Sequence, residues 1–143
     1  MIAMCDISKM YPNVDVEEGL TSIERRLQTN PSPLGLSPAT IVEGLRICLG
    51  CNCVQFKNNF YLPNRGVAMG SCIACDFSDV WMGDITEHHI STSPVDTLNF
   101  HLYRDDGIDV LIDGDQQKEI LLNHLNNLHP NLTWTVDVAK EGE

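Results

Sequence analysis

Residues 100–112, FHLYRDDGIDVLI, place two adjacent aspartates between two apolar runs. The run FHLY leads into Asp105 and Asp106, and the run IDVLI follows them. Asp106-Gly107 is a strong hairpin signal, because a type I′ turn needs positive φ at both central residues. The stretch therefore predicts a β-hairpin with both carboxylates at or beside its tip. Adjacent carboxylates repel unless a cation such as a divalent metal ion lies near them, and the alternative is an ordinary solvated turn.

The N-terminal run MIAMCD supplies a third carboxylate. Its pattern predicts a strand over residues 2–6 that ends on Asp6, so that this carboxylate lies at the edge of a sheet. Sites for two-metal phosphoryl transfer need several carboxylates around ions about 3.5–4 Å apart. Asp6 could join the hairpin pair in such a site, and the alternative is that it only caps the strand end.

A glycine-rich turn, GVAMGS at residues 66–71, lies midway between the acidic segments and opens a helical stretch. Such turns allow a ligand to approach the backbone closely. Tyr11 follows Asp6 in the segment DISKMY.

The ordered segments DISKMY, GVAMGS and YRDD resemble motifs A, B and C of a reverse transcriptase palm. The later stretch HLNNLHPNLTWTVD resembles the motif D region of the same family. Within reverse transcriptases, MYP after the first Asp, GVAMGS, and LHPN followed by a strand most resemble Penelope-like retroelements. The resemblance covers the chain from Asp6 to about Asp137.

This resemblance implies an RNA-directed DNA polymerase, in which residues 1–143 form a partial palm domain without fingers and thumb. The fold it implies is α+β, a palm-type antiparallel sheet with helices packed on one face. The implied partners are an RNA template, a DNA primer, dNTP, and the fingers and thumb regions of a longer protein. The second hypothesis for the function is a catalytically inactive, truncated remnant of such an enzyme.

The resemblance also implies a metal site. Asp6 and Asp105 would be the main ligands of two Mg²⁺ ions, Asp106 would assist, and the backbone carbonyl of Ile7 would be an extra ligand. Mg²⁺ prefers carboxylate oxygen and water, which suits these aspartates, and Mn²⁺ is a possible substitute.

Further residues of the resembling motifs would contact the substrate. Tyr11 stands where the family carries an aromatic gate against the ribose 2′-hydroxyl. The remaining predicted substrate contacts are Gly66, Met69, Gly70, Ser71 and Tyr103. The chain departs from the family at Arg104, where Ala, Val or Met is more usual, and at Pro63, where related sequences often have Gln.

The amino-acid composition limits the classes of protein to which this chain can belong. Hydrophobic residues make up 43% of the chain, a value typical of globular proteins. No apolar stretch approaches the roughly 20 residues of a membrane span, and no basic region precedes the first apolar residues, so an intracellular location in nucleus or cytoplasm is expected. The net charge of −11 is unfavourable for nucleic-acid binding.

The cysteines suggest a third hypothesis for the function. Cys48 and Cys51, with Cys72 and Cys75, match the C-x2-C spacing of zinc sites, which would indicate a zinc-binding interaction module. The resemblance to a palm places Cys72 and Cys75 in a helix, and this interpretation disfavours a zinc site. His88-His89 is interpreted as surface, because neighbouring residues of a helix point about 100° apart.

Local signals predict the remaining elements. Asp15 with Glu18 forms a capping box before a helix to Gln28, and Ser37 with Pro38 starts a second helix that runs to about Gly50. Two short strands are expected around Asn58-Asn59, a third helix over about residues 71–88, a fourth helix to Leu128, and a last strand in TWTVDV.

Overall fold

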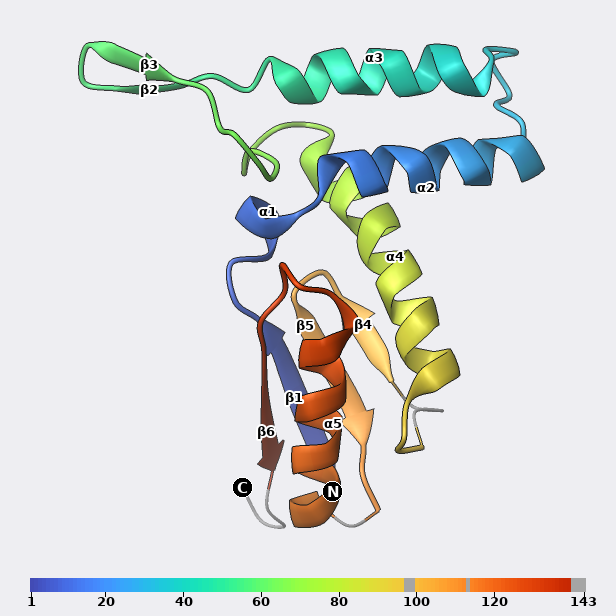
Figure 1. Ribbon diagram of the computed structural model, residues 1–143, viewed down its shortest axis with the longest axis vertical. Coiled ribbons are helices and arrows are strands. Elements are labelled where there is room, and N and C mark those ends of the chain that lie inside the picture. The colour runs from blue at the N-terminus through green and yellow to red at the C-terminus, as the bar shows by residue number, and fades with distance from the viewer. Residues whose placement is uncertain (97–99, 113, 140–143) are drawn as a thin grey trace. The chain divides into compact units, whose positions relative to one another are not determined.

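The computed structural model describes residues 1–96, 100–112 and 114–139. It divides into two compact units, drawn with their element labels in Figure 1. The first unit comprises Met1–Met10 and Met82–Glu143, and the second comprises Tyr11–Trp81. Five helices accompany a four-stranded antiparallel sheet and a separate two-stranded hairpin in the described residues, so the expected α+β class is confirmed.

The first unit contains the four-stranded sheet. Its strand order is β4-β5-β1-β6, and each neighbouring pair is antiparallel. The strands are β1 (Ile2–Ile7), β4 (His101–Tyr103), β5 (Asp106–Val110) and β6 (Trp134–Ala139). The predicted first strand is thus confirmed, but β1 is an inner strand, so Asp6 lies near the end of a central strand and not on an edge strand.

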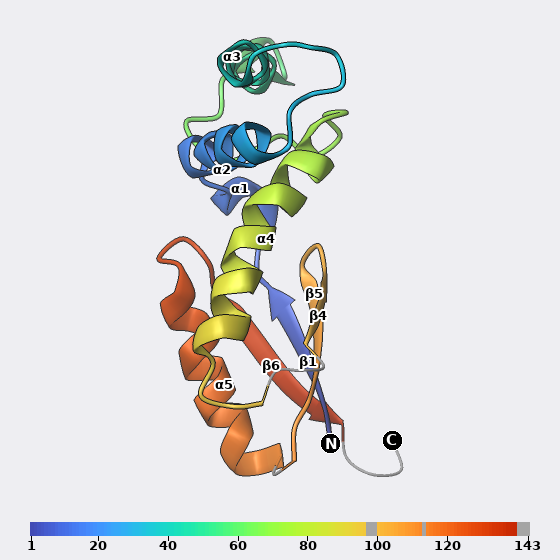
Figure 2. The same cartoon turned by 90° about the vertical axis from the view of Figure 1, so that its right-hand side faces the viewer.

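One face of this sheet is covered and the other is exposed. Helix α5 (Gly114–Leu128) lies along the covered face (Figure 2) and buries Leu121 and Leu125 completely. The Asn126 side chain fixes α5 to β6, because its Oδ1 accepts the Trp134 N–H at 2.9 Å and its Nδ2 donates to the Trp134 carbonyl at 3.2 Å. The alternation of buried and exposed residues along β1 and β5 follows from this one-sided cover.

The second unit is mainly helical. It contains α2 (Val16–Thr29), α3 (Pro38–Gly50), the hairpin of β2 (Val54–Phe56) and β3 (Asn59–Tyr61), most of the short α1 (Met10–Asn13), and the first residues of α4 (Ala74–Thr92). Asp15 and Ser37 are confirmed as N-caps. The Asp15 carboxylate accepts the N–H groups of Glu17 and Glu18, and the Ser37 hydroxyl accepts the Thr40 N–H.

Contacts between α2 and its neighbours hold the second unit together. A Cβ on Gly19 would lie 2.5 Å from Cζ of Phe77, so α2 and α4 approach as closely as a glycine permits. The buried Trp81 indole donates to Oε2 of Glu18 at 3.1 Å. On the other side of α2, Arg46 of α3 forms an ion pair with Glu17.

Several boundaries differ from the sequence prediction. Helix α4 begins at Ala74, later than residue 71, and ends at Thr92, beyond residue 88, while α1 was not predicted at all. The turn of the β2–β3 hairpin is Lys57-Asn58, one residue earlier than expected, and Lys57 takes a positive φ of 56° there. No helix within the described residues is long and apolar enough to cross a membrane.

His89 corrects a further expectation, because it is only 1% exposed while His88 is exposed. Its ring lies 4.4 Å from the Phe100 ring and 5.2 Å from the His124 ring, measured between centroids. A helix passing over a packed core turns one of two adjacent residues inward, and here it is the second. Burial, with a smaller effect of His124, lowers the pKa of His89 to about 4.

The lowered pKa predicts acid sensitivity. Because the folded protein keeps His89 neutral, its contribution to stability is present above the unfolded pKa of about 6.5 and is lost as pH falls towards about 4. The free energy of unfolding of the wild type should fall by up to about 3 kcal/mol over this range, and His89→Leu should abolish this fall. Urea unfolding at a series of pH values measures it. The control His88→Leu should keep the wild-type slope. If the free energy of unfolding of His89→Leu falls with pH as steeply as that of the wild type, His89 is not the group responsible.

Candidate active site

The register of the first unit places Asp6 directly opposite Asp106. Asp6 pairs with Asp106 across β1 and β5, Tyr103 pairs with Asp106 across β4 and β5, and Thr135 pairs with Asp6 across β6 and β1. All four side chains are exposed, so one row crosses the open face of the sheet. We call Tyr103, Asp106, Asp6 and Thr135 the carboxylate row. Like charges directly opposite in a sheet destabilise it, so a cation between Asp6 and Asp106 would be stabilising.

The hairpin turn lies two residues earlier than Asp106-Gly107. Tyr103 pairs with Asp106, so the two-residue loop is Arg104-Asp105, and Arg104 takes a positive φ of 58°. Arginine rarely adopts this conformation. Its guanidinium carbon lies 5.3 Å from the centroid of the Tyr103 ring, over that ring. The prediction that both carboxylates lie at or beside the tip still holds, but the Asp-Gly turn was wrong.

Gly107 has a different role from the one predicted. It lies in β5 opposite Cys5, and a Cβ on Gly107 would be 3.1 Å from Cβ of Cys5. The glycine is therefore explained by close packing on the covered face and not by a turn. Burial, with a smaller effect of Asp109, raises the pKa of the Cys5 thiol to about 12, so this cysteine is held as a neutral thiol.

Asp105 lies in the hairpin turn and is partly buried. Its backbone carbonyl accepts the Ile7 N–H at 3.0 Å, which ties the turn to the end of β1. The Ile7 side chain is buried, and its backbone runs beside Trp134 of β6. The structure therefore brings Asp6, Ile7, Asp105, Asp106 and Tyr103 to one end of the sheet in the first unit.

A second group of predicted residues meets in the second unit. The Val67 N–H donates to the Tyr11 carbonyl at 2.9 Å, so the GVAMGS turn is hydrogen-bonded to α1. The Tyr11 hydroxyl lies 3.5 Å from Sγ of Cys75 in α4. The first contact fixes the Tyr11 backbone and the second holds the end of its side chain, which is partly exposed.

The two glycines of the turn are needed for different reasons. Gly66 has a φ of 75°, and a Cβ there would lie 2.5 Å from the Pro12 carbonyl oxygen. Gly70 has a φ of 91° with open space around it. Ser71 closes the turn, since its N–H donates to the Ala68 carbonyl at 3.2 Å. Met69 is 76% exposed, so its side chain is available to a ligand.

The cysteines form neither disulfides nor a metal cluster among the described residues. All six cysteines are free; Cys5 is buried, Cys75 is partly exposed, and the other four are exposed. Among the described residues, no three His, Cys, Asp or Glu side chains gather closely enough to hold a metal ion as they stand. Asp6 and Asp106 of the carboxylate row offer oxygen donors, which suit Mg²⁺ and not a thiolate-bound zinc.

Sequence reasoning missed two residues beside the predicted site. Thr135 extends the carboxylate row on β6, and alternation in TWTVDV could have placed it on the outward face, though not opposite Asp6. Cys75 was considered as a zinc ligand or as a residue of the helix, but not as the partner of the Tyr11 hydroxyl.

No model of a known protein family matches the chain, and no curated protein is significantly similar to it.

The two glycines provide a matched test of the turn. We expect Gly66→Ala to cost about 3 kcal/mol or more, because the new methyl group meets a backbone carbonyl and the φ is unfavourable. Gly70→Ala carries only the unfavourable φ and should cost about 1–2 kcal/mol. Urea unfolding followed by circular dichroism measures both. If both variants lose the same free energy of unfolding, the close approach of Gly66 to Pro12 in the structure is contradicted.

Proposed function

We propose that this chain is the palm region of an RNA-directed DNA polymerase, a reverse transcriptase of a retroelement. The observation that carries the proposal is the placement of Asp6 directly opposite Asp106, with Asp105 in the adjoining turn. Sequence segments far apart in the chain thus supply three carboxylates to one end of one sheet. Two-metal nucleotidyl transfer needs several carboxylates near one another, and this placement supports the proposal.

The residues present fit divalent metal ions. Asp6, Asp105 and Asp106, with the carbonyl of Ile7, would hold Mg²⁺, or Mn²⁺ in its place, through oxygen donors. Bound there, the metal ions would stabilise the charge that develops when a primer 3′-hydroxyl attacks the α-phosphate of a dNTP.

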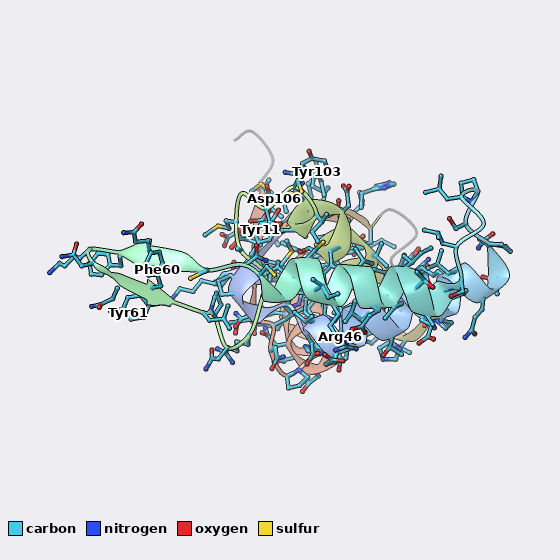
Figure 3. All side chains as sticks on the ribbon, turned by 90° about the horizontal axis from the view of Figure 1, so that it is seen from above. Tyr11, Arg46, Phe60, Tyr61, Tyr103 and Asp106 are labelled. Carbon is cyan, nitrogen blue, oxygen red and sulfur yellow. The ribbon has the colours of Figure 1, made fainter. Side chains whose placement is uncertain are left out.

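The protein contributes position and rigidity to this reaction. Asp6 lies on an inner strand with a hydrogen-bonded neighbour on each side, so its backbone is fixed. The hydrogen bond from the Ile7 N–H to the Asp105 carbonyl holds the hairpin turn against β1. Tyr103, next to Asp106 (Figure 3), is 71% exposed and would contact the primer end or the nucleotide.

The second unit would select the substrate. The Tyr11 ring, whose hydroxyl contacts the Cys75 thiol and whose backbone is bonded to the GVAMGS turn, would exclude a ribose 2′-hydroxyl by its bulk. Gly66, Met69, Gly70 and Ser71 would form the surface that follows the template and the incoming base pair. The RNA template, DNA primer and dNTP are the partners that this proposal requires.

The second candidate is an inactive remnant of the same enzyme. Arg104 favours it, because a cation beside Asp105 competes with metal ions for the carboxylate, and Pro63 favours it because proline offers no side-chain donor. The net charge of −11 favours it as well, since phosphate contacts come from Lys and Arg.

Primer extension distinguishes the candidates. We expect no measurable extension by the 143-residue chain at micromolar concentration, because its 9 Lys and Arg, against 20 Asp and Glu, offer few contacts to phosphates. A chimaera that adds fingers and thumb from a Penelope-like reverse transcriptase should extend a DNA primer on an RNA template. Asp105→Asn in that chimaera should lower the rate by about a thousandfold or more, since metal-ion stabilisation supplies several kcal/mol.

Asp137→Asn is the matched control, because Asp137 lies on the same open face of the sheet beyond the carboxylate row. It should extend at the wild-type rate. A well-folded chimaera that never extends would support the remnant, and one that extends equally well with Asp105→Asn would refute the metal site.

Tyr11→Ala in the active chimaera tests the sugar gate. Loss of the ring should raise the incorporation of rNTP relative to dNTP by about tenfold or more, because a steric clash typically costs at least 1–3 kcal/mol. Single-nucleotide incorporation rates for both sugars provide the ratio. Tyr11→Phe keeps the bulk and should keep the selectivity, whereas an unchanged ratio in Tyr11→Ala would make Tyr11 a core residue only.

A further inference from the structure

Two exposed apolar surfaces of this chain are not explained by its own core. The first lies on the open face of the four-stranded sheet, where Ile2 faces Val110 and Met4 faces Ile108 across β1 and β5. These four side chains are 43–52% exposed, and we call them the sheet patch. Facing pairs on two adjacent strands form a contiguous patch, and a contiguous exposed apolar patch commonly marks an interaction surface.

The second surface lies on the β2–β3 hairpin, which extends beyond the end of α3 (Figures 1 and 3). Val54 pairs with Tyr61, and Phe56 lies two residues after Val54, so the three side chains share one face. They are 49–61% exposed, and we call them the hairpin face. Phe60 pairs with Gln55 and therefore belongs to the reverse face. Because an isolated two-stranded hairpin is only marginally stable in water, a partner that covers the hairpin face would stabilise it.

The hairpin lies in a part of the sequence that has no negative charge. All 20 Asp and Glu of the chain lie outside residues 44–75. Lys57, in the turn of the hairpin, is exposed, and its Nζ lies 5.5 Å from the centroid of the Phe56 ring. The hairpin face therefore combines apolar side chains with an adjacent cation.

The sheet patch, in contrast, lies beside negative charge. Asp6 and Asp106 are the next facing pair of the same two strands, and both are exposed on the same face as the patch. The hairpin face thus complements the open face of the sheet in apolar character and in charge. Complementary charge selects one partner over others more than it adds affinity.

We propose that the hairpin face of one copy of this chain binds the sheet patch of a second copy. The apolar side chains of the two surfaces pack together, and Lys57 lies near Asp6 and Asp106 of the second copy. A second copy is the occupant because the chain itself carries both complementary surfaces. Each copy offers one surface of each kind, so the contact is heterologous. The inference uses the two aspartates only as charges and does not depend on the proposed metal site.

Sedimentation equilibrium from micromolar to millimolar protein tests the proposal. A chelator keeps the carboxylates free of metal ions, and a reducing agent keeps the exposed cysteines as thiols. In about 0.15 M salt the Debye length is about 8 Å, so distant negative charges of the two copies are screened while charges in contact still attract. We expect the mass to rise with concentration and a Kd on the order of 10⁻⁴ M, because two small patches make less than a standard interface.

Matched variants locate the two surfaces. Phe56→Ser on the hairpin face and Ile108→Lys on the sheet patch should each weaken self-association by about tenfold or more, since each removes a large apolar contact. The controls are Phe60→Ser on the reverse face and Ile120→Lys on α5, which should change the Kd by about twofold at most. Lys57→Glu should weaken self-association by about threefold or more, because it reverses the charge that faces the acidic pair.

A mixture of the two defective variants tests whether unlike surfaces meet. Phe56→Ser keeps its sheet patch, and Ile108→Lys keeps its hairpin face. The two variants should therefore associate with each other about tenfold more tightly than either associates with itself. Sedimentation with a fluorescent label on one variant measures this, and recovery in the mixture also shows that both variants are folded.

Several outcomes would overturn the proposal. The first is a wild-type chain that stays monomeric at millimolar concentration, and the second is wild-type self-association by Phe56→Ser or Ile108→Lys. The third is a mixture of variants, each folded by circular dichroism, that shows no recovery. A monomeric wild type in which Phe56→Ser shifts the backbone amide NMR signals of β1 and β5 would assign the contact to a single copy. Association that disappears when bound nucleic acid is removed would assign the hairpin face to that ligand instead.

Discussion

The pairing of β1 with β5 is the constraint on which the candidate site depends. It sets Asp6 opposite Asp106, two like charges across a sheet, where repulsion opposes folding unless a cation compensates it. The same register sets Cys5 against Gly107 on the covered face, where only glycine fits without displacement. A shift by one residue would send every side chain to the wrong face, so the packing of Cys5 against Gly107 also determines where the carboxylates lie.

The covered face contains groups that the proposed chemistry does not use. Asp109 is fully buried, and burial raises the pKa of its carboxyl, although the hydrogen bond from the Val110 N–H to Oδ1 opposes this rise. Burial also raises the pKa of the Cys5 thiol to about 12 and lowers the pKa of His89 to about 4, so both side chains are neutral near pH 7. The two faces of the sheet therefore differ. Burial disfavours the charged forms of the ionisable groups on the covered face, while Asp6 and Asp106 on the open face are exposed.

Local signals in the sequence predicted the starts of α2 and α3 well, because the caps at Asp15 and Ser37 involve only neighbouring backbone N–H groups. They failed where tertiary contacts decide. The Asp-Gly turn moved to Arg104-Asp105 because Gly107 is required against Cys5, a residue distant in sequence. Alternation alone could not pair Thr135 with Asp6, nor show which of His88 and His89 faces the core, since both depend on contacts between distant segments.

The most direct test of the metal site is the stability of Asp6→Asn relative to the wild type, measured by urea unfolding with and without Mn²⁺. In metal-free protein the variant should be more stable by about 0.2–1 kcal/mol, because it removes one of two facing charges. With Mn²⁺ at about 100 times its Kd the order should reverse, because the wild type alone gains about 2.7 kcal/mol. Equal stabilisation of both proteins by Mn²⁺, or a metal-free variant that is less stable than the wild type, would contradict the account.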